Sequence, residues 1–174
     1  MKQIVIDSDS HPLYATFKDL YRVSFPIFEQ RSESQQAQAF KNHKYKLLAF
    51  TEEHTFLGFI AYWQFDSYRY VEHFAINADL RGKGYGSRVL NEFTHSAPET
   101  VILEIDPIQD DVTEARWRFY EKCGFCKNPY THLHPPYNKE AYSPHVLVVL
   151  SSEKEITELE YQTFFQDLRT VVMD

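Results

Sequence analysis

Hydrophobic residues recur along the chain with two different periods, and the changes of period predict its secondary structure. Alternation every second residue, or a short apolar run, predicts strands at residues 2–7, 47–51, 56–65, 70–76 and 101–106 and in the later stretch HVLVVLSS. Spacings of three and four residues predict helices at residues 11–23 and 27–40, from the glycines near 82 to about 95, at 111–123, and from about 154. The order is strand, two helices, three strands of an antiparallel meander, helix, strand, helix, two strands and helix. This order predicts an α/β domain built on a mixed sheet.

Local signals predict where one of these helices begins and ends. Asp111 and Glu114 have the spacing of a capping box at the start of the helix over residues 111–123. Gly124 stands where a helix commonly ends, and Lys122 places a cation in the last turn, where it suits the helix dipole. The side chains expected to form the buried stripe of this helix are Val112, Ala115 and Phe119.

Composition and charge exclude several classes of protein. At 174 residues, of which 43% are hydrophobic and 25% charged, the chain is expected to form one domain over residues 1–174. A formal charge of −7 at pH 7 lacks the basic excess of a generic nucleic-acid-binding protein. MKQIVIDSDS reaches polar residues too early for a signal peptide, and apolar runs such as VLVVL are too short to span a bilayer. We therefore expect a cytoplasmic protein with neither a nucleic acid nor a membrane as partner.

The stretch LRGKGYGSRVL, residues 80–90, contains three of the five glycines of the chain at alternate positions. Glycines allow backbone conformations that aim successive N–H groups into one concavity, and the helix that follows adds its unpaired amides and its positive dipole end. Arg81, Lys83 and Arg88 add positive charge. The stretch therefore predicts a site for a phosphate or a pyrophosphate, unless the glycines serve only a tight connection between strand and helix.

Two common phosphate-binding patterns do not fit. A P-loop requires Gly-Lys-Ser/Thr at a spacing that is absent here. A dinucleotide-binding fold requires G-x-G-x-x-G directly after its strand, whereas here the third glycine comes one residue early and an antiparallel meander precedes it. A small nucleotide-dependent oxidoreductase is therefore disfavoured, although Asp106 lies at a plausible distance for a ribose ligand.

A third pattern fits more of the chain. Residues 81–86 match R/Q-x-x-G-x-G, the strand VEHFAI precedes them, and FYEKCGF (residues 119–125) follows the next strand. With these motifs the sequence resembles the GNAT superfamily of N-acetyltransferases, and SFP, RWRFYEKCGF and HPPY resemble a bacterial subgroup of it. The resemblance implies the GNAT (acyl-CoA N-acyltransferase) fold, an α/β fold whose mixed, mostly antiparallel sheet is splayed between its fourth and fifth strands and flanked by helices. It also implies transfer of an acetyl group from acetyl-CoA directly to an amine of a small molecule or peptide, with no metal.

The resemblance assigns roles to particular residues. Tyr120 would be the general acid that protonates the departing thiolate, and it would also contact the cofactor. Thr113 stands where many members have an asparagine that contacts the cofactor, which leaves that contact in doubt. The remaining residues expected to bind acetyl-CoA are Phe74, Ala75 and Ile76 at the strand end, and Arg81, Gly82, Lys83, Gly84, Tyr85, Gly86 and Ser87.

The general base has two candidates. An alkyl ammonium has a pKa near 10.4, so its deprotonation at pH 7 costs roughly 4 to 5 kcal/mol, and a carboxylate that acts directly or through water would help. Glu104 in LEID and Glu72 on the other splayed strand both match positions that relatives use. Each of them could instead be a solvated or substrate-binding carboxylate.

Other features leave alternatives open. The spacing of Cys123 and Cys126 suits a redox site or, with His132 and His134, a zinc site, but the cysteines stand at the end of a helix and the histidine spacing fits no standard finger. Aromatic residues at 62–70 and in HPPY either wall the acceptor pocket or pack in the core, and His73 is expected to pack on its strand. The competing function is an acyl-CoA sensor without turnover. A homodimer is possible if HVLVVLSS is an exposed edge strand.

Overall fold

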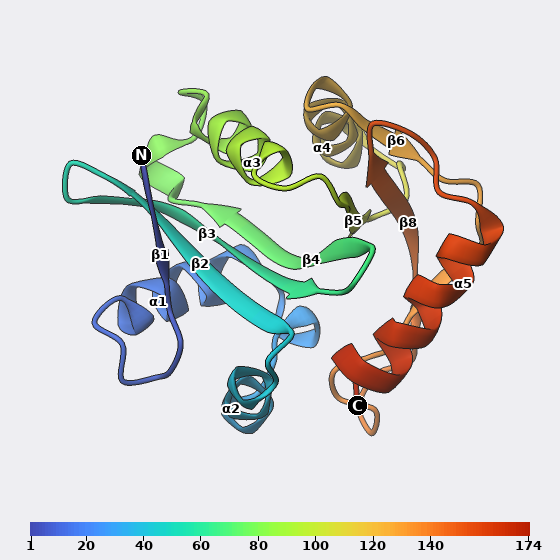
Figure 1. Cartoon of the computed structure of the whole chain (residues 1–174), viewed down its shortest axis with the longest axis horizontal. Coiled ribbons are helices and arrows are strands. Elements are labelled where there is room, and N and C mark those ends of the chain that lie inside the picture. Colours follow the sequence, from blue (N-terminus) through green and yellow to red (C-terminus); the bar gives the residue numbers. More distant parts are fainter.

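The computed structural model describes residues 1–174, in which helices flank one mixed sheet of eight strands (Figure 1). The strands are β1 (Lys2–Val5), β2 (Tyr45–Glu52), β3 (Thr55–Gln64), β4 (Tyr68–Ile76), β5 (Thr100–Ile105), β6 (Phe125–Lys127), β7 (His132–His134) and β8 (His145–Ser152). The α-helices are α1 (Tyr14–Ser24), α2 (Glu33–Lys41), α3 (Tyr85–His95), α4 (Asp111–Lys122) and α5 (Glu158–Asp167). Two 3-10 turns, η1 (Ile27–Glu29) and η2 (Ala78–Leu80), and a π-helical turn, η3 (Leu168–Val172), complete the chain.

The strand order is β1-β2-β3-β4-β5-β8-β6, with β7 also paired to β8. The pairing of β4 with β5 is parallel and extends only from Tyr68 opposite Thr100 to Tyr70 opposite Ile102. Beyond this point β5 continues along β8 while β4 continues along β3, so the two central strands diverge (Figure 1). The other strand pairs are antiparallel. The predicted mixed sheet, splayed between its fourth and fifth strands, is confirmed.

A β-bulge interrupts β4 just after the point of divergence. Ala61 of β3 pairs with His73 and Tyr62 pairs with Val71, so Glu72 is the extra residue on β4. Bulges bend a strand and change the direction of a side chain, and they are common beside functional sites. No sequence pattern predicts this irregularity.

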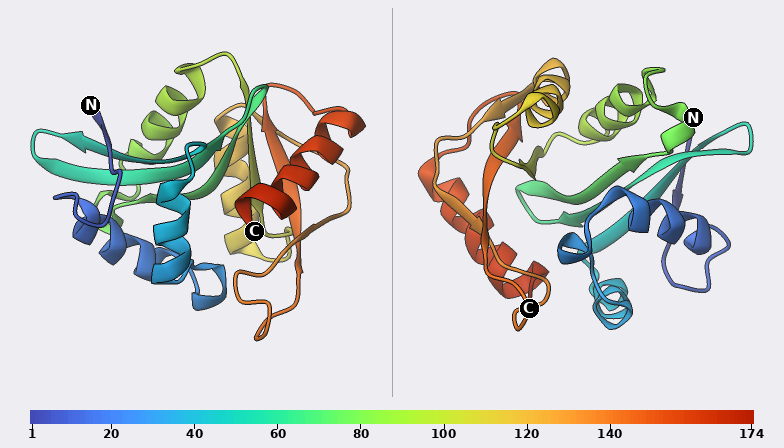
Figure 2. Two further views of the ribbon diagram at one scale, coloured as in Figure 1. Left: turned by 60° about the horizontal axis from the view of Figure 1, so that its bottom comes forward. Right: turned by 180° about the vertical axis from the view of Figure 1, so that it is seen from behind.

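Two apolar layers hold the helices on opposite faces of the sheet (Figure 2). On one face α1, α2 and α5 contribute to a core that includes Phe17, Ala39, Trp63 and Phe164. On the other face the α3 side chains Val89, Leu90 and Phe93 pack against β4 and β5, which is the face that the sequence predicts for this helix. Full burial of each large apolar side chain stabilises the fold by about 1.5 to 3 kcal/mol. None of the helices is long and apolar enough to cross a membrane.

The helix predicted over residues 27–40 is two elements. Pro26 and the extended Gln30 bound the short turn η1, and α2 begins only after Ser32. Ser32 and Gln35 form a reciprocal capping box, in which the serine hydroxyl accepts from the Gln35 amide at 3.1 Å. Ser32, which lies inside the predicted helix over residues 27–40, is therefore the N-cap of α2.

The predicted start of α4 at residue 111 agrees with the structure, but its predicted capping box and most of its predicted buried stripe were wrong. Asp110, not Asp111, is the N-cap, and its partner in the capping box is Thr113 rather than Glu114. Val112 is 68% exposed and Ala115 is exposed, so they do not form a buried stripe. The contacts of α4 with the core come from Trp117, Phe119 and Tyr120, because the helix rests on the sheet only through its second half. Gly124 adopts a φ of 88°, as expected for the residue that ends a helix.

The C-terminal part of the chain contains more strand than predicted. β8 pairs with β7 over residues 145–147, with β5 from Val148 to Ser151, and with β6 over residues 150–152. Both β5 and β6 pair with it only at Leu150 and Ser151, so subunit pairing through HVLVVLSS stays a prediction. The final helix begins after Thr157, which caps it together with Glu160, rather than near residue 154.

Candidate active site

A cleft of about 920 Å³ opens where β4 and β5 diverge. Its walls come from the bulged half of β4, the glycine turn before α3, the end of β5, the second half of α4, the segment around η1, and the β7–β8 region. The lining residues that carry polar chemistry are Ser24, Glu29, Tyr70, Glu72, His73, Arg81, Ser87, Glu104, Asp106, Arg116, Tyr120, His134, Tyr137 and His145. The site therefore joins six segments that are distant in sequence.

At one end of the cleft the backbone amides from Gly82 to Ser87 are unpaired. None of them donates to a backbone carbonyl or to a side chain, and the first bond into this turn is made by the Arg88 amide to the Gly84 carbonyl at 3.2 Å. Six consecutive free amides at the positive end of an 11-residue helix form a site for an anion.

Glycine is required at two positions of this turn. Gly82 and Gly84 have φ values of 77° and 81°, in the left-handed region that L side chains rarely adopt. At Gly86 an added Cβ would lie 3.4 Å from the Phe119 ring of α4, which is van der Waals contact. Gly82 and Gly84 therefore set the direction of the amides, and Gly86 packs beside α4.

Positive charge is distributed unevenly around the turn. Arg81 lines the cleft, whereas Arg88 points to Glu52 of β2, with 2.8 Å between Nη2 and Oε1. Lys83 and Tyr85 are not among the residues that line the cleft. The free amides and the charge of Arg81 suit a phosphate or a diphosphate.

Comparison with known proteins identifies the fold. Residues 11–125 match the sequence profile of the acetyltransferase (GNAT) family, which is more than half of the chain. The chain belongs to the GNAT acetyltransferase family. The predicted family, fold and enzyme class are thus confirmed.

Individual relatives agree with this assignment. The Bacillus subtilis protein named Putative acetyltransferase YjbC is 28% identical over 103 residues, which are 58% of this chain. The matched region is 52% of that protein, so the chain aligns with about half the length of its relative. A solved GNAT-family structure from Bacteroides thetaiotaomicron superposes with a TM-score of 0.92 at 26% identity, covering 99% of this chain and 98% of the other. An aminoglycoside 6'-N-acetyltransferase complexed with coenzyme A shares the fold at a TM-score of 0.60 and 17% identity, covering 87% and 96% of the two chains.

Tyr120 of this GNAT protein lies on the cleft wall near the end of α4. Its ring packs edge-on against Phe119 and Phe125, with centroid distances of 5.1 and 5.8 Å, and no protein group hydrogen-bonds its hydroxyl. Burial raises the pKa of Tyr120 to about 12, so the hydroxyl keeps its proton throughout the neutral range. The side chain is thus a free proton donor that faces the cleft.

Glu104 lies near the end of β5 and its side chain is only 6% exposed. One carboxylate oxygen accepts from the Tyr70 hydroxyl and the other from His132 Nε2, while His134 Nε2 lies 3.7 Å from the first oxygen. Burial opposes ionisation, but the charge of His134 and the hydrogen bonds of His132 and Tyr70 outweigh it and hold the pKa of Glu104 below its ordinary value. Glu104 is therefore an ionised carboxylate in a network of donors.

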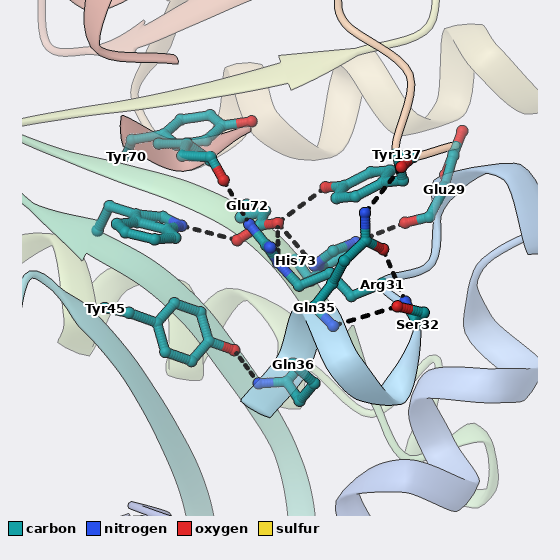
Figure 3. A network of polar contacts seen from close by, with 12 residues as sticks. Glu29, Arg31, Ser32, Gln35, Gln36, Tyr45, Tyr70, Glu72, His73 and Tyr137 are labelled. Atoms are coloured by element: carbon teal, nitrogen blue, oxygen red, sulfur yellow. Dashed lines mark hydrogen bonds and ion pairs between the residues drawn. The ribbon is translucent and has the colours of Figure 1, made fainter. Parts of the chain in front are cut away.

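Glu72, the bulge residue, is fixed by three donors (Figure 3). Arg31 Nε lies 2.8 Å from Oε1, the Tyr137 hydroxyl lies 2.9 Å from the same oxygen, and Trp63 Nε1 lies 2.7 Å from Oε2. Burial opposes ionisation here too, but the charges of Arg31 and His73 and the hydrogen bonds of Trp63 and Arg31 together outweigh it and lower the pKa of Glu72. The carboxylate side chain is 0% exposed, so the part of this residue that faces the cleft is its main chain.

The other predicted residues divide between the cleft and its surroundings. Phe74, Ala75 and Ile76 line the cleft along the edge of β4 that β5 has left. Thr113 does not line it, because its hydroxyl is hydrogen-bonded within the cap of α4 at 2.8 Å from Asp110 Oδ1. His73 packs on its strand as expected, with Nε2 2.8 Å from the Glu29 carbonyl.

Several cleft residues were missed or left undecided by the sequence reasoning. Trp63 from the aromatic stretch is buried in the core, whereas Tyr70 from the same stretch and Tyr137 from HPPY line the cleft. Arg31 was not singled out, because only the fold brings it to Glu72. The four side chains Cys123, Cys126, His132 and His134 do not gather into a metal site.

Proposed function

We propose that this protein transfers the acetyl group of acetyl-CoA directly to an amine of a small molecule or peptide. The observation that carries the proposal is the continuity of the cleft, which extends from the free amides at Gly82–Ser87 to the divergence of β4 and β5. Such a cleft accommodates a long ligand with a diphosphate at one end and a reactive group at the other. The coenzyme A complex of an aminoglycoside acetyltransferase with the same fold supports this choice of ligand.

Each requirement of acetyl transfer has a residue in the cleft. Bound acetyl-CoA supplies the thioester. The amides at 82–87 and Arg81 would hold the diphosphate, and the free edge of Phe74–Ile76 would hydrogen-bond the pantetheine arm. Tyr120 donates a proton to the departing sulfur, which its raised pKa allows at neutral pH. Glu104 takes part in removing a proton from the amine, whereas Glu72 shapes the wall.

The acceptor end of the cleft favours a cation. Glu72 is paired with Arg31, Asp106 lies 2.9 Å from Arg116, and Glu104 is surrounded by histidines. Glu29 has no such basic partner within hydrogen-bonding distance, and burial together with the charge of Asp106 raises its pKa. A protonated amine would relieve this repulsion, so positively charged acceptors are preferred over neutral ones.

Binding and turnover test this proposal separately. Calorimetric titration with acetyl-CoA should show binding, and release of the CoA thiol should depend on an added amine from a panel of spermidine, kanamycin and an alanine-initiated peptide. Absence of acetyl-CoA binding would refute the proposal. Binding without turnover on any amine of the panel would favour the alternative function, an acyl-CoA sensor.

A further inference from the structure

We infer that His134 is the group that takes the proton from the acceptor amine, and that Glu104 is the positioning residue that orients it. The inference rests on the proposed acetyl transfer and adds a catalytic residue to it. Neither role is evident from sequence, since HPPY indicates only a proline-rich loop with aromatic character.

His134 occupies the last position of β7 and pairs with His145 of β8. It lines the cleft although it is only 4% exposed, so its accessible surface belongs to the cleft wall. Nε2 lies 3.4 Å from the Tyr70 hydroxyl and 3.7 Å from Glu104 Oε1. Tyr70 is the last residue of β4 that pairs with β5, so the imidazole stands where the two strands begin to diverge.

A backbone contact fixes the tautomer of His134. Nδ1 lies 2.6 Å from the Pro135 carbonyl oxygen. A carbonyl oxygen only accepts hydrogen bonds, so Nδ1 carries the hydrogen. In the neutral imidazole Nε2 then has the free lone pair, which is the form that accepts a proton.

Glu104 is better suited to orient a base than to act as one. Both of its oxygens already accept hydrogen bonds, from Tyr70 and from His132. The second ring nitrogen of His132 lies 2.9 Å from the Tyr161 hydroxyl, so His132 is held from both sides and is 0% exposed. The carboxylate is therefore fixed in place, with Oε1 3.7 Å from Nε2 of His134.

The charged and titratable groups around His134 come from every element packed near it. They are Tyr70 and His73 on β4, Glu104 on β5, His132 on β7, Tyr137 in the following loop, His145 on β8 and Glu29 in η1. Glu29 and Glu104 are the acidic members of this group, and His145 faces the ring from β8 with 5.8 Å between the ring centroids. Burial and the charge of His134 lower the pKa of His145.

Each proton that leaves the acceptor nitrogen has an acceptor in the cleft or in solvent. His134 Nε2 takes one proton from the acceptor ammonium, and the neutral nitrogen forms the N–C bond as the C–S bond breaks. Tyr120 gives its proton to the thiolate, and the second N–H proton of the attacking nitrogen restores the Tyr120 hydroxyl through solvent. His134 releases its proton to solvent, so each turnover yields one amide, one CoA thiol and one proton.

Nuclear magnetic resonance of the ¹⁵N-histidine-labelled full chain tests the tautomer without any acceptor. We expect the neutral His134 ring to carry its hydrogen on Nδ1, with the resonance assigned by its loss in His134→Gln. A ring protonated on Nε2 instead would overturn the inference, because Nε2 would then have no lone pair to accept a proton.

Kinetics tests the catalytic role on whichever amine of the panel the wild type acetylates. His134→Gln should lower kcat by about 100-fold at pH 7, and the deficit should shrink towards pH 10 as the free amine accumulates. Glu104→Gln should lower kcat with the same pH dependence, and Glu104→Asp, which keeps the charge, should recover part of the rate. His43→Gln, at an exposed position outside the cleft, is the matched control.

The outcomes separate the two proposals. A wild type that acetylates an amine while His134→Gln has an unchanged pH profile refutes the role of His134 and leaves acetyl transfer intact. A wild type that acetylates nothing refutes acetyl transfer to those amines, and the NMR measurement still decides whether Nε2 is available as a base. Calorimetric binding of acetyl-CoA by each variant shows whether its fold is retained.

Discussion

Replacing Gly84 by Asp and by Asn tests the anion site with two variants of nearly equal shape. Gly84 has a φ of 81°, and a Cβ added there meets no atom within 4 Å. Asn and Asp adopt left-handed backbone more readily than other residues, so each should destabilise the fold by roughly 1 kcal/mol. The two variants differ in one negative charge, placed among the free amides of the turn.

The effect of that charge on binding follows from Coulomb's law. For a carboxylate about 5 Å from one phosphate charge, the repulsion is about 0.8 kcal/mol in a fully aqueous environment and about 3.3 kcal/mol at the effective dielectric of a protein surface. Because the turn is exposed, the true value lies between these limits. Gly84→Asp should therefore bind acetyl-CoA between about 4-fold and about 270-fold more weakly than Gly84→Asn.

Isothermal titration with acetyl-CoA at low and at high salt measures this difference directly. High salt should reduce the difference in acetyl-CoA affinity between Gly84→Asp and Gly84→Asn, because salt screens exposed charges, with a screening length of about 10 Å at 0.1 M ionic strength. Urea unfolding of both variants controls for the backbone effect. Equal dissociation constants for Asp and Asn, at equal stability, would mean that the diphosphate does not lie on these amides.

Three further predictions concern other parts of the structure. Tyr120→Phe should lower kcat by about 100-fold and leave acetyl-CoA binding intact in titration; because burial raises the pKa of Tyr120 to about 12, the wild-type rate should not fall between pH 9 and pH 10.5 through loss of this proton. Glu72→Gln should lower the free energy of unfolding by about 3 kcal/mol at pH 7, since it leaves Arg31 buried without its counter-charge. The lowered pKa of Glu72 means that its contribution is complete above about pH 4.3 and is lost as the pH falls through the folded pKa, so the urea midpoints of mutant and wild type should converge in acid. Val112→Ser, at a side chain that is 68% exposed, should change the free energy of unfolding by less than about 0.5 kcal/mol; a larger loss would indicate that α4 buries this face.

The features that could be predicted from sequence are those with local causes. The alternation in β2 to β5 depends only on which side chains face the core, and the glycine turn depends on φ values that few residues other than Gly adopt. Local signals led to a wrong prediction where two interpretations fitted the same residues. Asp110 and Asp111 are both good cap residues, and only the hydrogen bonds with Thr113 decide between them.

The arrangement of the site could not be predicted because its contacts join distant parts of the chain. Glu72 meets Arg31 across 41 residues and Tyr137 across 65 residues. His132 and His134 reach Glu104 only because β7 pairs with β8, and β8 pairs with β5. No periodicity or motif in the sequence indicates such long-range contacts.

Exposure and charge separate the two candidate carboxylates. Glu72 accepts hydrogen bonds from Arg31 and Tyr137 and thereby holds the cleft wall together. Arg31 in turn donates to the Val172 carbonyl near the C-terminus, and the Tyr137 carbonyl accepts from Gln35 of α2. Taking a proton at Glu72 would weaken four segments of the fold at once. Glu104 faces a histidine that can change its charge without breaking a backbone contact, since His134 keeps its Nδ1 bond to Pro135 in both states. Protonation of His134 beside Glu104 therefore disrupts fewer contacts of the fold than protonation of Glu72.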